Sequence, residues 1–193
     1  MNCKTETEKY KEQWYVLRVL FGRELKLKEK LSERNIKCFV PLKYVETNKE
    51  GITKRKLISA ISCLLFIHTN RVVIYALKCE YKYILPFMYL VDKSTQKPMI
   101  VRDREMCNFI AIAGNRELTE YVHYLGKEAQ TLKRGEEVIV KSGIFKGIKG
   151  RIVRVKRQRR VLVELQGIAN VVTAYIPNEL LECKNKQPKE KVC

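Results

Sequence analysis

The chain has 193 residues, and 46% of them are hydrophobic, which is enough to give one or two globular domains a core of their own. Its 39 lysines and arginines outnumber 21 acidic residues, and the formal net charge of +18 favours a polyanionic partner without identifying it. Seven cysteines without a C-x-x-C pair, no signal peptide pattern and no apolar run of about 18 residues exclude a disulfide-stapled secreted protein and a membrane-spanning one. We therefore expect reduced, mostly buried thiols, a cytoplasmic location, and neither a metal site nor another cofactor.

The N-terminal part begins with a charged segment and continues into a buried strand. Residues 1–13 carry charge without apolar periodicity and are expected to form a disordered leader. Residues 14–20 read WYVLRVL, apolar on both faces except at Arg18, which predicts a central strand. Residues 23–34 follow with leucines one turn apart, so they predict a helix whose lysines and arginine face water.

Three further segments follow before the second helix. Residues 38–40 predict a short strand, and the polar residues 43–56 form either a projecting hairpin or a disordered arm. Residues 61–68 predict a third strand that is apolar on both faces, with Leu64 and Phe66 on the same side.

The order of elements then indicates a fold class. Residues 71–80 have helical spacing and residues 84–91 return to a strand, which gives the order strand, helix, strand, strand, helix, strand. This is the split βαββαβ order, in which helices cover one face of a four-stranded antiparallel sheet. A final helix starting at Asp103 and closed by Gly114 would complete an α+β domain over residues 14–114.

The C-terminal part reads as a small β-domain behind a linker. Residues 115–131 are polar without sustained periodicity and are expected to connect the two domains. The domain is expected over residues 132–183, with strands at 138–140, 152–155, 161–165 and 171–176. Residues 184–193 look like a basic tail.

Four residues in this second domain carry a recognisable spacing. Gly143, Phe145, Gly147 and Gly150 resemble the KOW motif Gly-x-Phe-x-Gly-x-x-Gly, and Gly135 precedes them. The resemblance implies an SH3-like β-barrel in which Phe145 is the apolar plug. An ordinary glycine-rich hairpin is the alternative interpretation.

The two halves together resemble the NusG family of transcription elongation factors. The Trp14-Tyr15 start, the βαββαβ order and the KOW motif carry the resemblance over residues 14–182. The strings YLVDK (89–93), KPMIV (97–101) and DREM (103–106), leading into Phe109-Ile110, are similar to the specialised UpxY-type and RfaH-type antiterminators, the former of capsular polysaccharide operons. The prolines that the family usually has at the entry to its third strand are missing, which puts the detailed shape of that surface in doubt.

The resemblance implies a surface for the clamp helices of RNA polymerase. A strand that is apolar on both sides, with helices on one side only, leaves the other side to a partner. The residues assigned to polymerase binding are Ile61, Leu64, Phe66 and Phe21.

Nucleic-acid contacts are expected in both domains. Residues 146–160 contain a basic run without an acidic residue, although a solvated hairpin would explain it equally well. Residues near the first helix correspond to the region from which family members read the exposed non-template DNA strand. The assigned residues are Arg18, Arg23, Lys26, Lys156, Arg157, Arg159 and Arg160.

No pattern for catalysis is found in the sequence. His68 and His123 lack a matching nucleophile, and there is no P-loop or dinucleotide fingerprint. The sequence therefore predicts a monomeric, non-enzymatic protein without membrane association that binds RNA polymerase, suppresses pausing or premature termination, and uses its barrel to contact a ribosome or termination factor. A ribosomal or ribosome-assembly KOW protein that binds ribosomal RNA is the alternative.

Overall fold

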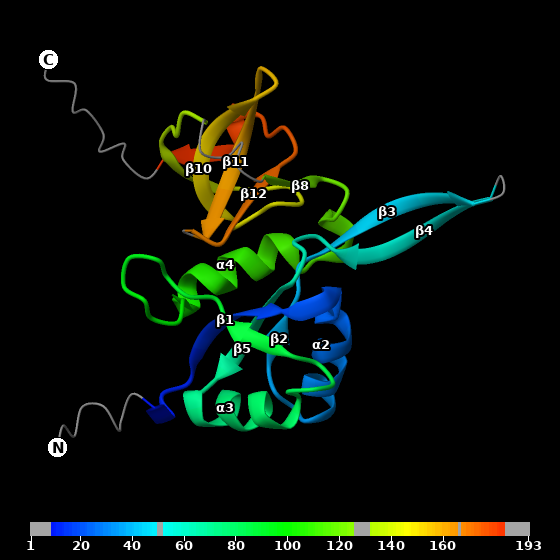
Figure 1. The fold of residues 1–193 in the computed structure, drawn as a ribbon. Helices are drawn as coiled ribbons and strands as arrows, with labels where there is room; N and C mark the ends of the chain where they lie inside the picture. Colours follow the sequence, from blue (N-terminus) through cyan, green and yellow to red (C-terminus); the bar gives the residue numbers. More distant parts are fainter. Residues whose placement is uncertain (1–8, 50–51, 126–131, 166, 184–193) are drawn as a thin grey trace, which may run out of the picture. The chain divides into compact units, whose positions relative to one another are not determined.

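The computed structural model describes residues 9–49, 52–125, 132–165 and 167–183, and the chain divides into two compact units, residues 1–107 and 108–193 (Figure 1). The predicted leader falls mostly on residues outside the described part, but its last residue, Gln13, already begins the first strand. The predicted basic tail lies entirely outside the described residues.

Among the described residues, the first unit contains an antiparallel sheet, a separate hairpin and the helices α2, α3 and the start of α4. The sheet has the order β2-β5-β1-β6, with β7 also paired to β1, and the described residues of β3 pair with β4. The elements are β1 Gln13–Val19, η1 Leu20–Gly22, α2 Glu24–Glu33, β2 Cys38–Phe39, β3 Leu42–Lys49, β4 Ile52–Ser59, β5 Leu64–Thr69, α3 Arg71–Glu80, β6 Phe87–Tyr89, β7 Ile100–Val101 and α4 Asp103–Ala113, whose second half is counted with the second unit.

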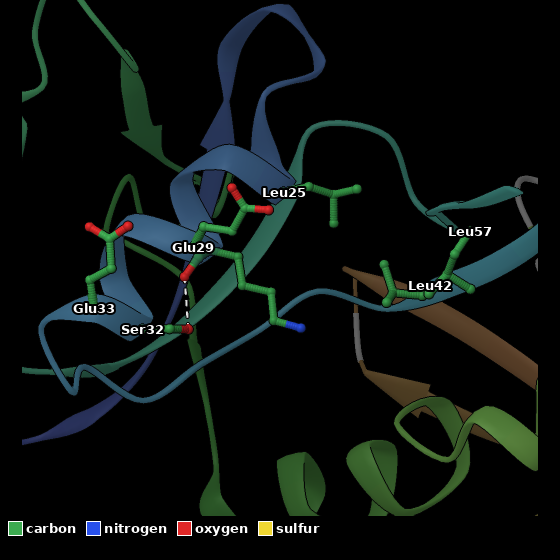
Figure 2. Close-up of a pocket in the computed structure, with 7 residues that line it drawn as sticks. Leu25, Glu29, Ser32, Glu33, Leu42 and Leu57 are labelled. Carbon is green, nitrogen blue, oxygen red and sulfur yellow. Dashed lines mark hydrogen bonds between the residues drawn. The ribbon is translucent and has the colours of Figure 1, made fainter.

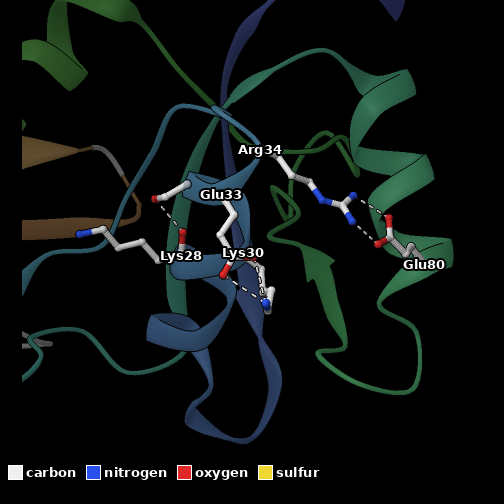
Figure 3. Close-up of polar contacts among 6 residues, drawn as sticks. Lys28, Lys30, Glu33, Arg34 and Glu80 are labelled. Atoms are coloured by element: carbon white, nitrogen blue, oxygen red, sulfur yellow. Dashed lines mark hydrogen bonds and ion pairs between the residues drawn. The ribbon is translucent and has the colours of Figure 1, made fainter.

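The main core of this unit lies between one face of the sheet and the helices α2 and α3. Tyr15 and Leu17 of β1 cluster with Leu27 of α2 and Ile74 of α3, and all four are fully buried. The apolar sides of α2 and α3 face the sheet because their buried residues recur about one helical turn apart, Leu27 and Leu31 in α2 and Ile74 and Leu77 in α3. Figure 3 shows that Arg34 after α2 and Glu80 of α3 also form an ion pair, with Nη1 and Oε2 2.7 Å apart.

The second unit is a six-stranded sheet in the order β13-β9-β10-β11-β12-β8. The middle of β11, residues 161–163, is buried on both faces, as expected for a strand inside a small curled sheet. The elements are η2 Arg116–Leu118, β8 Val122–Leu125, β9 Glu137–Val140, β10 Lys149–Val155, β11 Gln158–Leu165, β12 Ala169–Thr173, η4 Asn178–Leu180 and β13 Leu181–Cys183.

The predicted linker is partly wrong. Residues 122–125 form β8, which pairs with β12 so that His123 lies opposite Val172. A strand of four residues gives too short an alternation to be distinguished from a loop, and its pairing with a distant strand decides its conformation. Residues 126–131 of the predicted linker lie outside the described residues.

The expectation of mostly buried thiols is also wrong for the described cysteines. Burial raises the pKa of the Cys38 thiol, but even this residue is only half-buried. Cys79 and Cys107 lie on helices and are exposed, and Cys38, Cys63 and Cys183 lie at or near strand ends and are half-buried.

No helix within the described ranges is both long and apolar enough to cross a membrane.

The glycine-rich loop between β9 and β10 has the geometry that its sequence suggests. Gly143 and Gly147 have φ of +81° and +84°, a region that disfavours residues with a Cβ. Phe145 between them is buried, as expected of a plug. Gly150 is needed for a different reason, because a Cβ there would stand 2.4 Å from the carbonyl oxygen of Leu162 on β11.

Replacing Gly150 with alanine should therefore destabilise the second unit by about 1–3 kcal/mol, because backbone of β10 and β11 must separate to admit the methyl group. Hydrogen–deuterium exchange of β10 and β11 amides in the full chain would measure the loss. The control is Lys146→Ala in the same loop, whose exposed side chain should change stability by about 0.5 kcal/mol or less. Equal protection in both variants would contradict the close approach of the two strands.

Candidate functional site

The face of the first sheet that turns away from α2 and α3, called the outer face here, carries the predicted polymerase site. Directly opposed residues of antiparallel strands point to the same face. Pairing of β1 with β5 and β6 places the following residues on this face: Trp14, Val16, Arg18, Leu64, Phe66, His68 and Met88.

One end of the outer face is covered by the domain itself. Asp103, at the start of α4, has Oδ1 3.7 Å from Nε2 of His68, and the His68 ring makes an edge contact with Trp14 at a centroid distance of 5.2 Å. Met106, one turn into α4, is fully buried. The first turn of α4 therefore lies over this end.

The expectation that this domain leaves both Leu64 and Phe66 uncovered is therefore wrong, whereas their assignment to polymerase binding stays a prediction. Phe66 is 0% exposed and Leu64 is 7% exposed. The expectation considered α2 and α3, which cover the inner face of the sheet. The third predicted helix, α4, begins over the outer face. Phe66 packs beside Phe39 of β2 at a centroid distance of 6.3 Å, so its ring is in contact with a neighbouring strand of the sheet.

The other end of the outer face is open. Leu64, Arg18 and Met88 form a row across β5, β1 and β6, in which Arg18 is exposed and Met88 is 44% exposed. Phe21, in η1 two residues after the end of β1, has φ of +60° and is 76% exposed. Ile61, before β5, is half-buried.

Phe21 is held next to a cation. The guanidinium of Arg23 lies 5.6 Å from the centre of the Phe21 ring, and its Nη1 donates a hydrogen bond of 2.9 Å to the carbonyl oxygen of Ile84. The structure therefore brings together one predicted polymerase residue and one predicted nucleic-acid residue. Arg18 and Lys26 are exposed, but no described contact joins either of them to Arg23.

In the second unit, two predicted nucleic-acid residues form the tip of a hairpin. Lys156 and Arg157 connect β10 to β11 with φ of +50° and +64°, and Val155 pairs with Gln158 around them. Two successive positive φ values define a type I′ turn, for which Asn-Gly is the favoured sequence. Lysine and arginine each pay about 1 kcal/mol or more for this conformation, so the two charges are kept at a cost in stability.

The other two predicted basic residues are engaged with the protein. Arg159 donates from Nη1 to Oδ1 of Asn178 at 2.6 Å, and Arg160 donates from Nη1 to the carbonyl oxygen of Thr173 at 3.3 Å. The Nε of Arg160 is buried without a hydrogen-bond partner among the described residues. The tip residues Lys156 and Arg157 are therefore the ones exposed to a ligand.

Sequence reasoning missed His123 as a neighbour of this basic hairpin. Partial burial, Arg160 and Lys156 together lower the pKa of the His123 imidazole. A positive charge on His123 is disfavoured because it would sit beside two cations. No sequence signal could have shown this, since the proximity depends on β8 pairing with β12.

These features define a two-part α+β protein in which a KOW-type loop and a basic hairpin belong to one β-sheet and an apolar, partly open face belongs to the other. The family model described as "Transcription termination factor nusG" matches residues 12–110, just over half of the chain, and the KOW motif matches residues 134–164. The chain therefore belongs to the NusG family. No curated protein matches it. The ribosomal alternative is not favoured, because the NusG match covers the first unit.

Replacing Lys156-Arg157 with Asn-Gly should stabilise the second unit by about 1–2 kcal/mol, because these residues adopt the type I′ conformation readily. The same change should weaken binding to nucleic acid and lower the salt slope, log Kd against log[salt], by about one for each lost phosphate contact. Thermal unfolding and fluorescence anisotropy would measure the two effects. A variant that is more stable but has an unchanged salt slope would show that the turn is not part of the binding surface.

Proposed function

We propose that this protein is a transcription elongation factor that binds RNA polymerase through its first domain and suppresses pausing or premature termination. The observation that supports this most directly is a NusG match over residues 12–110 followed by a KOW match in the same chain. Proteins of this family generally bind RNA polymerase. The protein acts without catalysis, as a cytoplasmic monomer, and the second domain contacts a ribosome or termination factor.

The finer fold assignments belong to the same proposal. The sheet order β2-β5-β1-β6, with α2 and α3 packed on one face, supports a ferredoxin-like first domain. The buried plug Phe145 and the curled sheet from β13 to β8 support an SH3-like barrel.

The polymerase clamp docks at the open end of the outer face. Leu64 forms its inner margin, and the exposed side chains of Met88 and Phe21 supply apolar area that this unit leaves open to solvent. Burying two such side chains against a partner contributes about 1.5–3 kcal/mol each. Arg18 and Arg23 lie at the same end and face the non-template DNA strand.

The operon served is a capsular polysaccharide operon, and the protein acts there as a specialised antiterminator. The strings at residues 89–93, 97–101 and 103–106, similar to UpxY-type proteins, support this. In the structure Asp92 fixes the loop between the first two strings, because its Oδ1 accepts a hydrogen bond of 2.7 Å from the Ser94 amide. Transcription in vitro from such an operon leader, with and without the protein, would test it. Unchanged readthrough would contradict the antitermination role.

Met88→Ser and Phe21→Ser, singly and combined, should weaken polymerase binding about tenfold per side chain while leaving the fold intact, because both residues are exposed. Pull-down of purified polymerase and elongation through a pause site would measure the effect. The control is Tyr75→Ser on α3, which removes a 70% exposed aromatic residue from the helix layer on the opposite side of the sheet. Equal losses in the control would contradict docking at this end.

Phe66 needs a different expectation from Met88. Its ring is fully buried, so Phe66→Ala should lower the free energy of unfolding by about 3–5 kcal/mol and reduce polymerase binding through loss of the folded domain. A thermal melt alongside the pull-down separates the two causes. A variant that is as stable as the parent but does not bind polymerase would mean that Phe66 itself contacts the partner.

A further inference from the structure

The hairpin of β3 and β4 has two chemically different faces. The register pairs Lys43 with Ile58, Val45 with Lys56 and Thr47 with Lys54, and opposed residues share a face. One face, called the lysine face here, carries Lys43, Val45, Thr47, Lys54, Lys56 and Ile58. The reverse face carries Leu42, Tyr44, Glu46, Asn48, Thr53, Arg55, Leu57 and Ser59.

The reverse face contributes to holding the hairpin together. The Arg55 guanidinium stacks 4.1 Å above the centre of the Tyr44 ring, and Arg55 stands opposite Glu46 in the register. The Arg55 guanidinium and the Tyr44 ring are thereby engaged with each other within this face. Isolated two-stranded hairpins are only marginally stable, so contacts of this kind keep the strands paired beyond the core.

The root of the hairpin is anchored to the first domain. Leu42 and Leu25 pack against the main core cluster, and the amide of Ala60 donates a hydrogen bond of 2.8 Å to the carbonyl oxygen of Pro41. Figure 2 shows Leu42 and Leu57 of the hairpin lining a pocket together with Leu25 and Glu29 of α2. In Figure 1 the rest of the hairpin extends away from the sheet of its own unit.

The positive charges of the lysine face, by contrast, are not neutralised by described residues. Lys43, Lys54 and Lys56 are exposed, none of them forms an ion pair with a described residue, and the described side chains of this face include no carboxylate. Lys54 and Lys56 are two residues apart on one strand, about 7 Å, and Lys43 lies diagonally across from Lys56 at a similar distance. No described group of the domain neutralises these three charges, so all of them are open to an external anion.

We infer that the lysine face binds the sugar–phosphate backbone of double-stranded DNA. A row of cations on a two-stranded ribbon fits the chemistry of phosphates lining a groove, and the major groove is about 12 Å wide, enough to admit such a ribbon. Strands of eight residues at about 3.3 Å each reach about 25 Å, so the hairpin can follow a duplex over two thirds of a turn.

The composition of the face argues against a single strand as the ligand. Single-strand binding relies on aromatic side chains on which bases stack. The aromatic residue of the hairpin, Tyr44, lies on the reverse face, where Arg55 occupies its ring. The contact is therefore independent of sequence, and it needs neither polymerase nor the second domain.

The test uses the full chain and a labelled DNA duplex of about 20 base pairs, with binding followed by fluorescence anisotropy at several salt concentrations. Replacing Lys43, Lys54 and Lys56 together with alanine should weaken binding at least tenfold in low salt and reduce the salt slope by about 2–3, about 0.9 for each lost contact. Replacing the same three residues with arginine should preserve both quantities.

The matched control removes three exposed lysines from elsewhere in the same domain, Lys78, Lys93 and Lys97, and so lowers the net charge equally. Equal losses in both triple variants would mean that net charge alone acts, and would overturn the inference. The inference would also be overturned if the alanine triple variant lost as much or more affinity for single-stranded DNA of the same length as for the duplex. Circular dichroism checks folding, and a glutamine triple replaces the alanine triple if the hairpin is perturbed. Polymerase pull-down of the lysine variants separates this result from the proposed function.

Discussion

Strand β1 imposes the main constraint on the first domain, because it pairs with β5, β6 and β7 and is apolar on both faces. A strand with two apolar faces must be covered twice. Helices α2 and α3 cover one face through Leu27 and Ile74. On the other face the start of α4 lies over the end near Trp14 and His68, whereas Arg18 at the opposite end is exposed. The position of the proposed docking surface thus follows from where α4 begins.

Two of the proposed nucleic-acid contacts lie on β-hairpins, one at the tip of the β10–β11 hairpin and one on the β3–β4 hairpin. Lys156 and Arg157 hold positive φ at the β10–β11 turn, and the lysine face of the β3–β4 hairpin keeps like charges about 7 Å apart. The turn conformation costs stability that a glycine would not, and the charges of the lysine face are neutralised by no described residue. Such local conflicts with the rules of folding are expected at functional positions, because elsewhere selection for stability would remove them.

The sequence predicted features that depend on local chemistry. Two-sided apolarity identified β1, helical spacing identified residues 71–80, and glycine spacing identified the loop around Phe145. The burial of Phe66 and the strand β8 were missed because each depends on a contact with a segment distant in sequence. The positive φ of Lys156 and Arg157 was missed for a related reason: a two-residue turn is imposed by the pairing of β10 with β11, against the preference of the residues in it.

The magnitudes show that apolar contact alone is not enough for polymerase binding. Burial of Met88 and Phe21 would yield about 3–6 kcal/mol together, whereas a micromolar dissociation constant requires about 8 kcal/mol net, after an association cost of at least about 4 kcal/mol. The difference must come from further contacts. Arg18 stands between Leu64 and Met88 in the same row, and it is the charged residue that interrupts an otherwise apolar strand. An exposed cation there keeps the open end soluble in the free protein, and its proposed contact with phosphates of the non-template strand would add to the apolar contact. The DNA contacts proposed for Arg23 and for the lysine face would add to the same complex by tethering, since a second attachment raises the effective concentration of the first.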